Sequence, residues 1–269
     1  MKLSTYVTTS FLASFLLLTY SIYTYEQFYP VTLFLVTSKI SFVITVNLMI
    51  AMSLITAKSI NYFFLGQLRD TEVEMLFENT KFAITEICLA FTIFRNNFIT
   101  YNIICLFIIL IFIKSFHWLV KSRLDYLDQI MPESVYIHIK IGIYITLLII
   151  TDVILTYSCI KYTLQHGHSS IILFSFEFGL LCITIFNTTI RYILLLCDQY
   201  RTNGVILKGF YVMIIDLICD GLRFIVYICF FSIIFMYYGL PFHLMREVFM
   251  VSYTVVICVI VYFILFYII

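Results

Sequence analysis

The stretch LSTYVTTSFLASFLLLTYSIYTY, residues 3–25, contains no charged side chain and decides what kind of protein this is. Similar apolar runs recur along the chain at Ile141–Thr151, Tyr211–Tyr238 and Val248–Ile269. A helix of roughly 18 or more apolar residues is long enough to cross the ~30 Å hydrocarbon layer of a bilayer. Because lipid offers no hydrogen bonds, the backbone of such a segment must pair its own N–H and C=O groups within a helix. The runs therefore predict an all-α fold, a polytopic transmembrane helix bundle.

The composition supports a membrane protein and excludes several other classes. Hydrophobic residues make up 63% of the chain and charged residues 12%, whereas an ordinary soluble domain carries about 25% charged residues. The net charge of +1 offers no basic stripe for nucleic acid. No two of the cysteines are spaced C-x-x-C, so the sequence predicts neither a disulfide framework nor a metal or cofactor site. The run at residues 3–25 exceeds the ~7–15 apolar residues of a secretory signal, which predicts a retained first span.

Charged residues taken as boundaries divide the chain into about seven or eight spans. Two of them, Phe82–Phe94 and Tyr101–Ile113, are short for spanning helices, and each is expected to recruit neighbouring residues, Met75–Phe77 and Phe116–Val120 respectively. The remaining predicted spans are Leu3–Tyr25, Ile40–Ala57, Tyr136–Ile160, Ile171–Leu196, Tyr211–Tyr238 and the apolar tail Val248–Ile269.

Lysine and arginine in the connections predict the orientation, because cytosolic loops carry an excess of both residues. One side collects Lys2, Lys58, Arg69, Lys81, Lys114, Lys121, Arg123, Lys140, Arg191, Arg201 and Lys208. The other side has only Lys39, Arg95, Lys161 and Arg246. The bias predicts a cytosolic N-terminus.

The segment Leu65–Lys81 has the pattern of an amphipathic helix on the cytosolic side. Asp70, Glu74 and Glu78 recur every four residues on one face, and apolar residues such as Met75 lie roughly opposite. Such a helix is expected to lie at the membrane interface or to dock on the bundle.

Polar residues inside the predicted spans are the candidate functional residues, because an ionisable group at bilayer depth costs several kcal/mol and needs a partner or a wet cavity. Asp216, Asp220 and Arg223 share one helix face, so Asp220 and Arg223 are expected to pair. Two interpretations of the set remain open: a hydrophilic cavity in the bundle, or interhelical hydrogen bonds that only hold helices together. The full set is Glu86, Asp152, Glu177, Asn187, Arg191, Asp216, Asp220 and Arg223.

Several blocks of the sequence resemble the synoviolin family of endoplasmic-reticulum RING-type E3 ubiquitin ligases. They are Glu26–Pro30, Phe63–Arg69 with Glu72, Thr85–Arg95, Lys114–Leu119 with Arg123, Phe176–Glu177 and Tyr237–Pro241, in the order of the family. The individual positions that carry the resemblance are Gly66, Gln67, Leu68, Arg69, Glu72, Glu86, Phe116, His117, Trp118 and Arg123. The blocks cover residues 1–250, which we therefore expect to form a synoviolin-like multi-spanning membrane domain.

The resemblance implies a multi-pass protein of the endoplasmic-reticulum membrane that takes part in the degradation of misfolded proteins. Its implied partners are the lipid bilayer, a lumenal adaptor, a rhomboid-like pseudoprotease and misfolded protein substrates. Its implied role is to support substrate recognition and retrotranslocation. A ubiquitin-conjugating enzyme (E2) would bind only to a RING, which holds two zinc ions through Cys and His pairs. These pairs do not occur in this sequence, so the chain is not expected to transfer ubiquitin alone.

Residues 251–269 depart from the family pattern and run into aliphatic and aromatic sequence. Two hypotheses account for this tail: a translated intron, since Val251-Ser252 can be encoded by a splice-donor sequence, or a genuine extra span.

Two other functions stay open for the whole chain. A channel or transporter would show an ion-coordinating constellation or repeated halves, and a seven-span receptor would use the polar residues as packing contacts only.

Overall fold

The computed structural model describes residues 3–93, 101–130, 135–166, 171–200, 208–238, 249–257 and 259, and every regular element in these ranges is an α-helix. The helices are α1 (Leu3–Tyr25), α2 (Phe28–Thr37), α3 (Lys39–Leu65), α4 (Asp70–Ile93), α5 (Tyr101–Ile130), α6 (Val135–His166), α7 (Ile171–Tyr200) and α8 (Lys208–Tyr238). The all-α fold expected from the apolar runs is confirmed.

Five helices are long and apolar enough to cross a membrane, judged by length and composition. They are Ser4–Tyr25, Lys39–Leu65, Ile103–Ile130, Val135–Gln165 and Ile171–Gln199. The predicted seven or eight spans are not confirmed within the described ranges. The last predicted span, Val248–Ile269, lies largely outside the described residues, apart from the helical residues 249–257.

The helices differ in three places from the spans bounded by charged residues. The predicted amphipathic helix Leu65–Lys81 and the short span Phe82–Phe94 form one continuous helix, α4, which begins at Asp70. The short span Tyr101–Ile113 extends through Lys114 to Ile130 as α5, so the expected recruitment of neighbouring residues is confirmed and goes further. Residues 28–37, which lie between two predicted spans, form α2.

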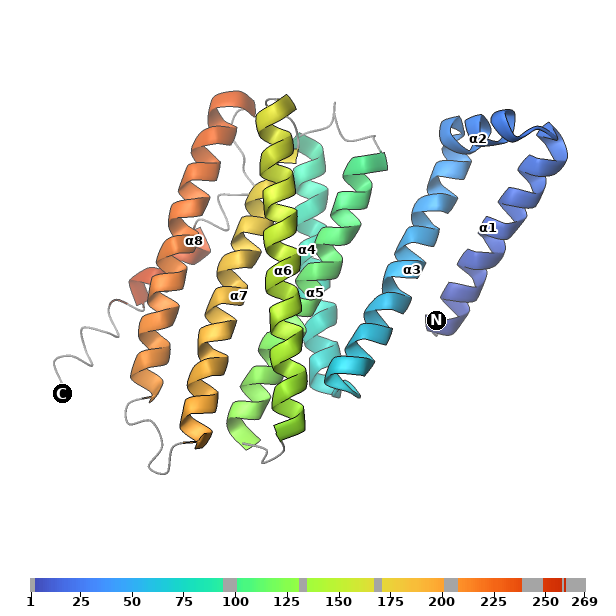
Figure 1. Cartoon of the computed structure of the whole chain (residues 1–269). Helices are drawn as coiled ribbons and strands as arrows, with labels where there is room; N and C mark the ends of the chain where they lie inside the picture. Colours follow the sequence, from blue (N-terminus) through green and yellow to red (C-terminus); the bar gives the residue numbers. More distant parts are fainter. Residues whose placement is uncertain are drawn as a thin grey trace.

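Gly66 explains why α3 stops at Leu65. Its φ is +73°, a left-handed conformation that glycine adopts readily, and its N–H donates to the carbonyl of Tyr62 at 3.2 Å. The chain then reverses into α4. The end of α3, the start of α4, the end of α5 and the start of α6 all lie at one end of the molecule (Figure 1), which we call the Gly66 end.

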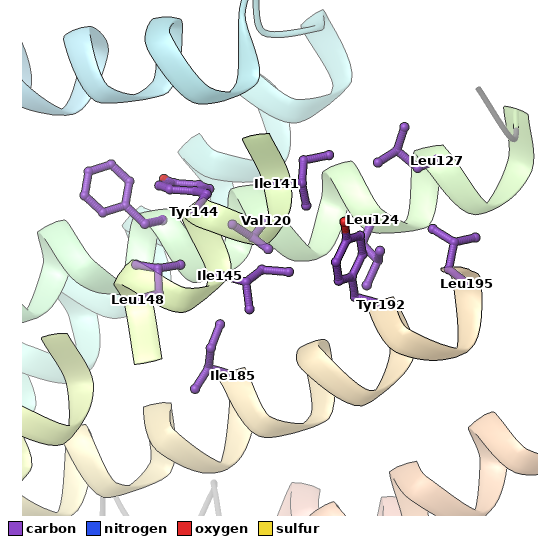
Figure 2. Close-up of a cluster of buried hydrophobic side chains, with 11 residues drawn as sticks. Val120, Leu124, Leu127, Ile141, Tyr144, Ile145, Leu148, Ile185, Tyr192 and Leu195 are labelled. Atoms are coloured by element: carbon purple, nitrogen blue, oxygen red, sulfur yellow. The ribbon is translucent and has the colours of Figure 1, made fainter. Parts of the chain in front are cut away.

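Helices α4 to α8 form a bundle, and α1 and α3 form a hairpin beside it (Figure 1). Helix α7 is central, because it packs against α5, α6 and α8. Eleven buried side chains of α5, α6 and α7 form one apolar cluster near the Gly66 end (Figure 2). A second buried cluster nearer the opposite end joins α5, α6 and α7 to Phe230 of α8. Within lipid, such close packing holds helices together, since lipid chains are themselves as apolar as leucine.

The hairpin joins the bundle through the last turns of α3. Ala57, Ile60, Phe64 and Leu65 pack against the cluster of Figure 2. The ring of Phe64 stacks on that of Tyr144 in α6, with ring centroids 4.9 Å apart. The Tyr144 hydroxyl also donates to Asn61 Oδ1 at 3.1 Å, so a buried amide and a buried phenol satisfy each other.

Candidate functional site

Polar side chains of α5, α7 and α8 pair with one another at several levels along these helices, and we call this set the polar column. On α7 the row consists of Glu177, Thr184, Arg191 and Asp198, spaced seven residues apart, so that all four lie on one helix face. At 1.5 Å per residue these positions extend over about 30 Å, close to the thickness of a hydrocarbon layer. The column therefore extends through most of the bundle's depth.

Lys208 occupies the Gly66 end of the column, in the first turn of α8. Its Nζ donates to Asp198 Oδ2 of α7 at 2.8 Å and also to Asp128 Oδ1 of α5. Burial lowers the pKa of Lys208, and the hydrogen bonds that its ammonium donates to the two carboxylates, with their negative charges, raise it by more, so the pKa lies above its ordinary value. Lys208 thus stays charged and ties three helices together at this end.

Arg191 and Asp216 form the next level of the column. Arg191 Nε donates to Asp216 Oδ1 at 3.1 Å and Arg191 Nη2 donates to Asp216 Oδ2, which is the two-pronged geometry that suits a guanidinium and a carboxylate. Arg191 Nη1 also lies 3.8 Å from Asp125 of α5. Asn187 donates to Asp216 Oδ1 at 3.0 Å from one turn away on α7.

Two further ion pairs continue the column away from the Gly66 end. Arg223 Nη1 donates to Asp220 Oδ1 at 2.9 Å, and Arg223 Nη2 lies 3.4 Å from the Thr184 hydroxyl. The pairing of Asp220 with Arg223, expected from their spacing, is therefore confirmed. Lys114 of α5 pairs with Glu177 of α7 at 2.8 Å.

The column changes from polar to aromatic beyond Arg223 on α8. Phe230, seven residues further on the same face, is buried against Phe176 with ring centroids 4.3 Å apart. The four cations of the column, in contrast, keep 17% to 25% of their side chains exposed. Each of these cations lies within ion-pair distance of at least one carboxylate, so the column presents alternating charges without a lone buried ion.

Asp152 lies apart from the column, in a buried pair between α5 and α6. His117 Nε2 lies 3.0 Å from Asp152 Oδ2 and 3.3 Å from Oδ1, and the two side chains are 1% and 0% exposed. The sequence leaves open whether Asp152 lines a cavity or makes an interhelical contact, and the structure places it against His117, a motif residue of the resemblance. A fully buried carboxylate of this kind holds helices together rather than lining a wet surface.

Glu72 lies at the centre of a second buried junction, at the Gly66 end. Its carboxylate is 0% exposed and pairs with Arg69 at 3.3 Å and with Arg123 of α5 at 2.9 Å. Arg123 also donates to the Gln67 carbonyl at 3.2 Å, and the Arg69 guanidinium lies 3.5 Å from the Tyr126 ring centroid. Positions from two separate motif blocks therefore meet, and they fasten the α3–α4 turn to α5.

The remaining motif positions either pack within the protein or lie outside the described residues. Phe116 is buried in the cluster of Figure 2, and Leu68 lies in the turn before α4. Trp118 is partly buried on α5. Glu86 lies within α4, and its side chain is outside the described residues.

Asp125, Asp128 and Asp198 are residues of this site that sequence reasoning missed, and Lys114 and Lys208 were counted only as boundary charges. The seven-residue repeat on α7 was the available signal, because it places polar groups on one face of a helix whose other faces are apolar. No group of three or more His, Cys, Asp or Glu side chains that could hold a metal ion occurs among the described residues.

Comparison with known proteins agrees with these observations. Residues 2–263 match the family described as "E3 ubiquitin-protein ligase synoviolin-like, TPR repeats". The match extends beyond Met250, where the sequence analysis places a domain boundary, and that boundary stays a prediction. The "ERAD-associated E3 ubiquitin-protein ligase hrd1" of Schizosaccharomyces pombe is 26% identical over 258 residues. The alignment covers 94% of this chain and 38% of the relative, so the chain spans well under half of that protein's length. The chain belongs to the synoviolin-like family.

Proposed function

We propose that this chain is the membrane domain of an E3 ubiquitin ligase system that degrades misfolded proteins of the endoplasmic reticulum. In this proposal the polar column is the surface along which a substrate polypeptide moves through the membrane. The observation that carries the proposal is the column itself, since about 30 Å of paired charges is a costly feature in lipid unless it lines a hydrophilic path. Family membership supports the same role.

The chemistry of the column suits an unfolded polypeptide as its occupant. Guanidinium and ammonium groups donate hydrogen bonds, and the carboxylates and hydroxyls accept them, so a passing backbone can exchange partners at every level. Because opposite charges alternate, the lining favours no single side-chain charge. The aromatic contact of Phe176 with Phe230 closes the row at one end.

The proposal places the Gly66 end in the cytosol. Arg69 in the α3–α4 turn, Lys140 in the second turn of α6 and Lys208 in the first turn of α8 lie at that end and support this orientation. A lumenal adaptor and a rhomboid-like pseudoprotease would then bind on the opposite side and in the membrane plane. Ubiquitin transfer would need a RING with its two zinc ions and a bound E2, which this sequence does not contain.

A chimera in fission yeast tests the proposal. This chain replaces the matched 258-residue segment of hrd1 in cells that lack their own copy, and the half-life of a misfolded lumenal protein is measured. We expect the chimera to shorten that half-life relative to the deletion strain. A chimera that reaches the endoplasmic-reticulum membrane at normal abundance yet leaves the substrate stable would contradict the proposal.

A further inference from the structure

Helix α2 joins two helices that qualify as membrane spans, and it lies across the end of the α1–α3 hairpin, opposite the Gly66 end (Figure 1). Its ten residues, FYPVTLFLVT, carry no charge. At 1.5 Å per residue the helix is about 15 Å long, half of what a bilayer crossing requires. A short, uncharged helix between two spans must therefore lie near the membrane surface.

The two faces of α2 have different surroundings. On the inner face, the Phe34 ring lies 5.2 Å from that of Tyr25 and 6.4 Å from that of Tyr20, both on α1. On the outer face, Tyr29, Leu33 and Val36 follow one another at helical spacing and are 75%, 51% and 65% exposed. The outer face is thus an apolar stripe without a protein partner among the described residues.

The two threonine hydroxyls of α2 find their hydrogen-bond partners within the helix. The Thr32 hydroxyl donates to the Tyr29 carbonyl and the Thr37 hydroxyl to the Leu33 carbonyl, each at 2.8 Å. Pro30 removes one N–H from the first turn, where helix donors otherwise lack partners. Neither hydroxyl therefore needs water, which is the condition for burial in an apolar phase.

Charged residues stand only at the two ends of the helix. Glu26 precedes α2 and has a φ of +51°, and Lys39 follows it; both are exposed. Tyrosines gather nearby, including Tyr23 at 88% exposed and Tyr29. Tyrosine rings are enriched at the boundary between lipid headgroups and acyl chains. The flanking charges and the tyrosine rings therefore both indicate that α2 lies at the membrane interface.

Among the described residues, the hairpin packs on the buried α5–α6–α7 cluster through the last turns of α3, at Ala57, Ile60, Phe64 and Leu65. Helix α1 packs against α2 and α3 in the described part of the chain. The attachment of the hairpin to the buried cluster is therefore at the Gly66 end, far from α2.

We propose that α2 is an interfacial helix that inserts its Tyr29–Leu33–Val36 face into the lipid leaflet and anchors the free end of the hairpin there. Lipid is the occupant because this face continues into the exposed apolar surfaces of α1 and α3, which themselves cross the bilayer; Ile40, just after α2, is 70% exposed. Buried apolar area then supplies the attachment without any protein partner.

Depth-dependent fluorescence quenching tests the proposal. Trp118 is the only tryptophan, so the full chain with Trp118→Phe, in nanodiscs, gives a dark background. Single reporters are introduced as Tyr29→Trp and Val36→Trp on the outer face, Phe34→Trp on the inner face, and Leu16→Trp, which is 62% exposed in the middle of α1. Quenching is measured with lipids spin-labelled near the headgroup, with lipids labelled deep in the chain, and with acrylamide in water.

The outer-face reporters are expected to be quenched about twofold or more strongly by the shallow label than by the deep one, because an interfacial helix lies ~5–10 Å into the headgroup–acyl boundary. Leu16→Trp should show the reverse order, and Phe34→Trp should be weakly quenched by both labels. Three results would overturn the proposal: outer-face reporters that acrylamide quenches more than either lipid label, reporters shielded from all three quenchers as under a protein, or stronger quenching by the deep label.

Discussion

Replacing Glu72 with alanine is expected to lower the free energy of unfolding by about 3 kcal/mol, because removing one partner of a buried ion pair leaves an uncompensated buried charge. Arg123 would lose its only carboxylate among the described contacts, and its side chain is 13% exposed. Arg69 is 34% exposed, so water screens part of its loss. The α3–α4 turn would then lose its main attachment to α5.

The matched control is Glu74→Ala, which removes an exposed carboxylate from the same helix and should change stability by less than about 0.5 kcal/mol. Unfolding is followed by titration with a denaturing detergent, with loss of helical circular dichroism as the signal. Glu72→Gln separates charge from shape, since it keeps the side-chain volume but not the carboxylate. If Glu72→Ala and Glu74→Ala unfold at the same detergent fraction, the junction does not stabilise the fold.

The second large effect concerns an apolar variant of the polar column, which should keep the stability of the protein but lose degradation activity. We expect the combined variant Asn187→Leu, Arg191→Met and Asp216→Leu to be as stable as the parent to within about 1 kcal/mol, because apolar replacement of an ion pair is often neutral or stabilising. Asp125, which also lies 3.8 Å from Arg191, is 53% exposed, so water solvates the charge that the variant leaves there. Asn187 is included because its amide would otherwise lose the Asp216 carboxylate to which it donates. In the fission-yeast chimera, the same variant is expected to slow degradation of the misfolded lumenal protein by about tenfold. The reason is that the column becomes apolar at the level of Arg191 and Asp216, so a polypeptide backbone passing there finds no hydrogen-bond partners.

This separation decides between the two interpretations that the sequence leaves open. If the polar groups only hold helices together, an apolar set that packs equally well should preserve degradation. Full degradation with unchanged stability would therefore support packing contacts and contradict a hydrophilic path. Lys208→Met is a less informative change, since it leaves Asp128 and Asp198 without their shared cation and disturbs stability as well.

The sequence predicts the helical class and one specific contact, and it fails where charges are satisfied by distant residues. Asp220 and Arg223 could be paired from their spacing alone, because both lie on one helix. Lys114 was taken as the end of a span, yet Glu177 of α7 neutralises it, so α5 continues through it. No local pattern shows that partner, because the two residues belong to separate helices.

Helix α2 and the buried pair of His117 with Asp152 were missed for related reasons. The stretch 28–37 is bounded by Glu26 and Lys39 and is too short for a span, so the search for long apolar runs does not detect it. His117 and Asp152 were each singled out, but for different roles, and only the packing of α5 beside α6 brings them together. Arg123 is likewise far from Arg69 and Glu72 in the sequence. Only the packing of α4 against α5 brings all three together as ion pairs, which explains why the motif contains these charges.

The most direct test of the account is photocrosslinking from within the column during degradation. A photoreactive amino acid is placed at Thr184, which lies in the column, or at Phe186, which is 54% exposed on a different face of α7 at nearly the same depth. Both are made in the fission-yeast chimera together with a misfolded lumenal substrate. We expect the substrate to crosslink to position 184 and not to position 186. Crosslinks from position 186 alone, or none from position 184 while the substrate is being degraded, would contradict it.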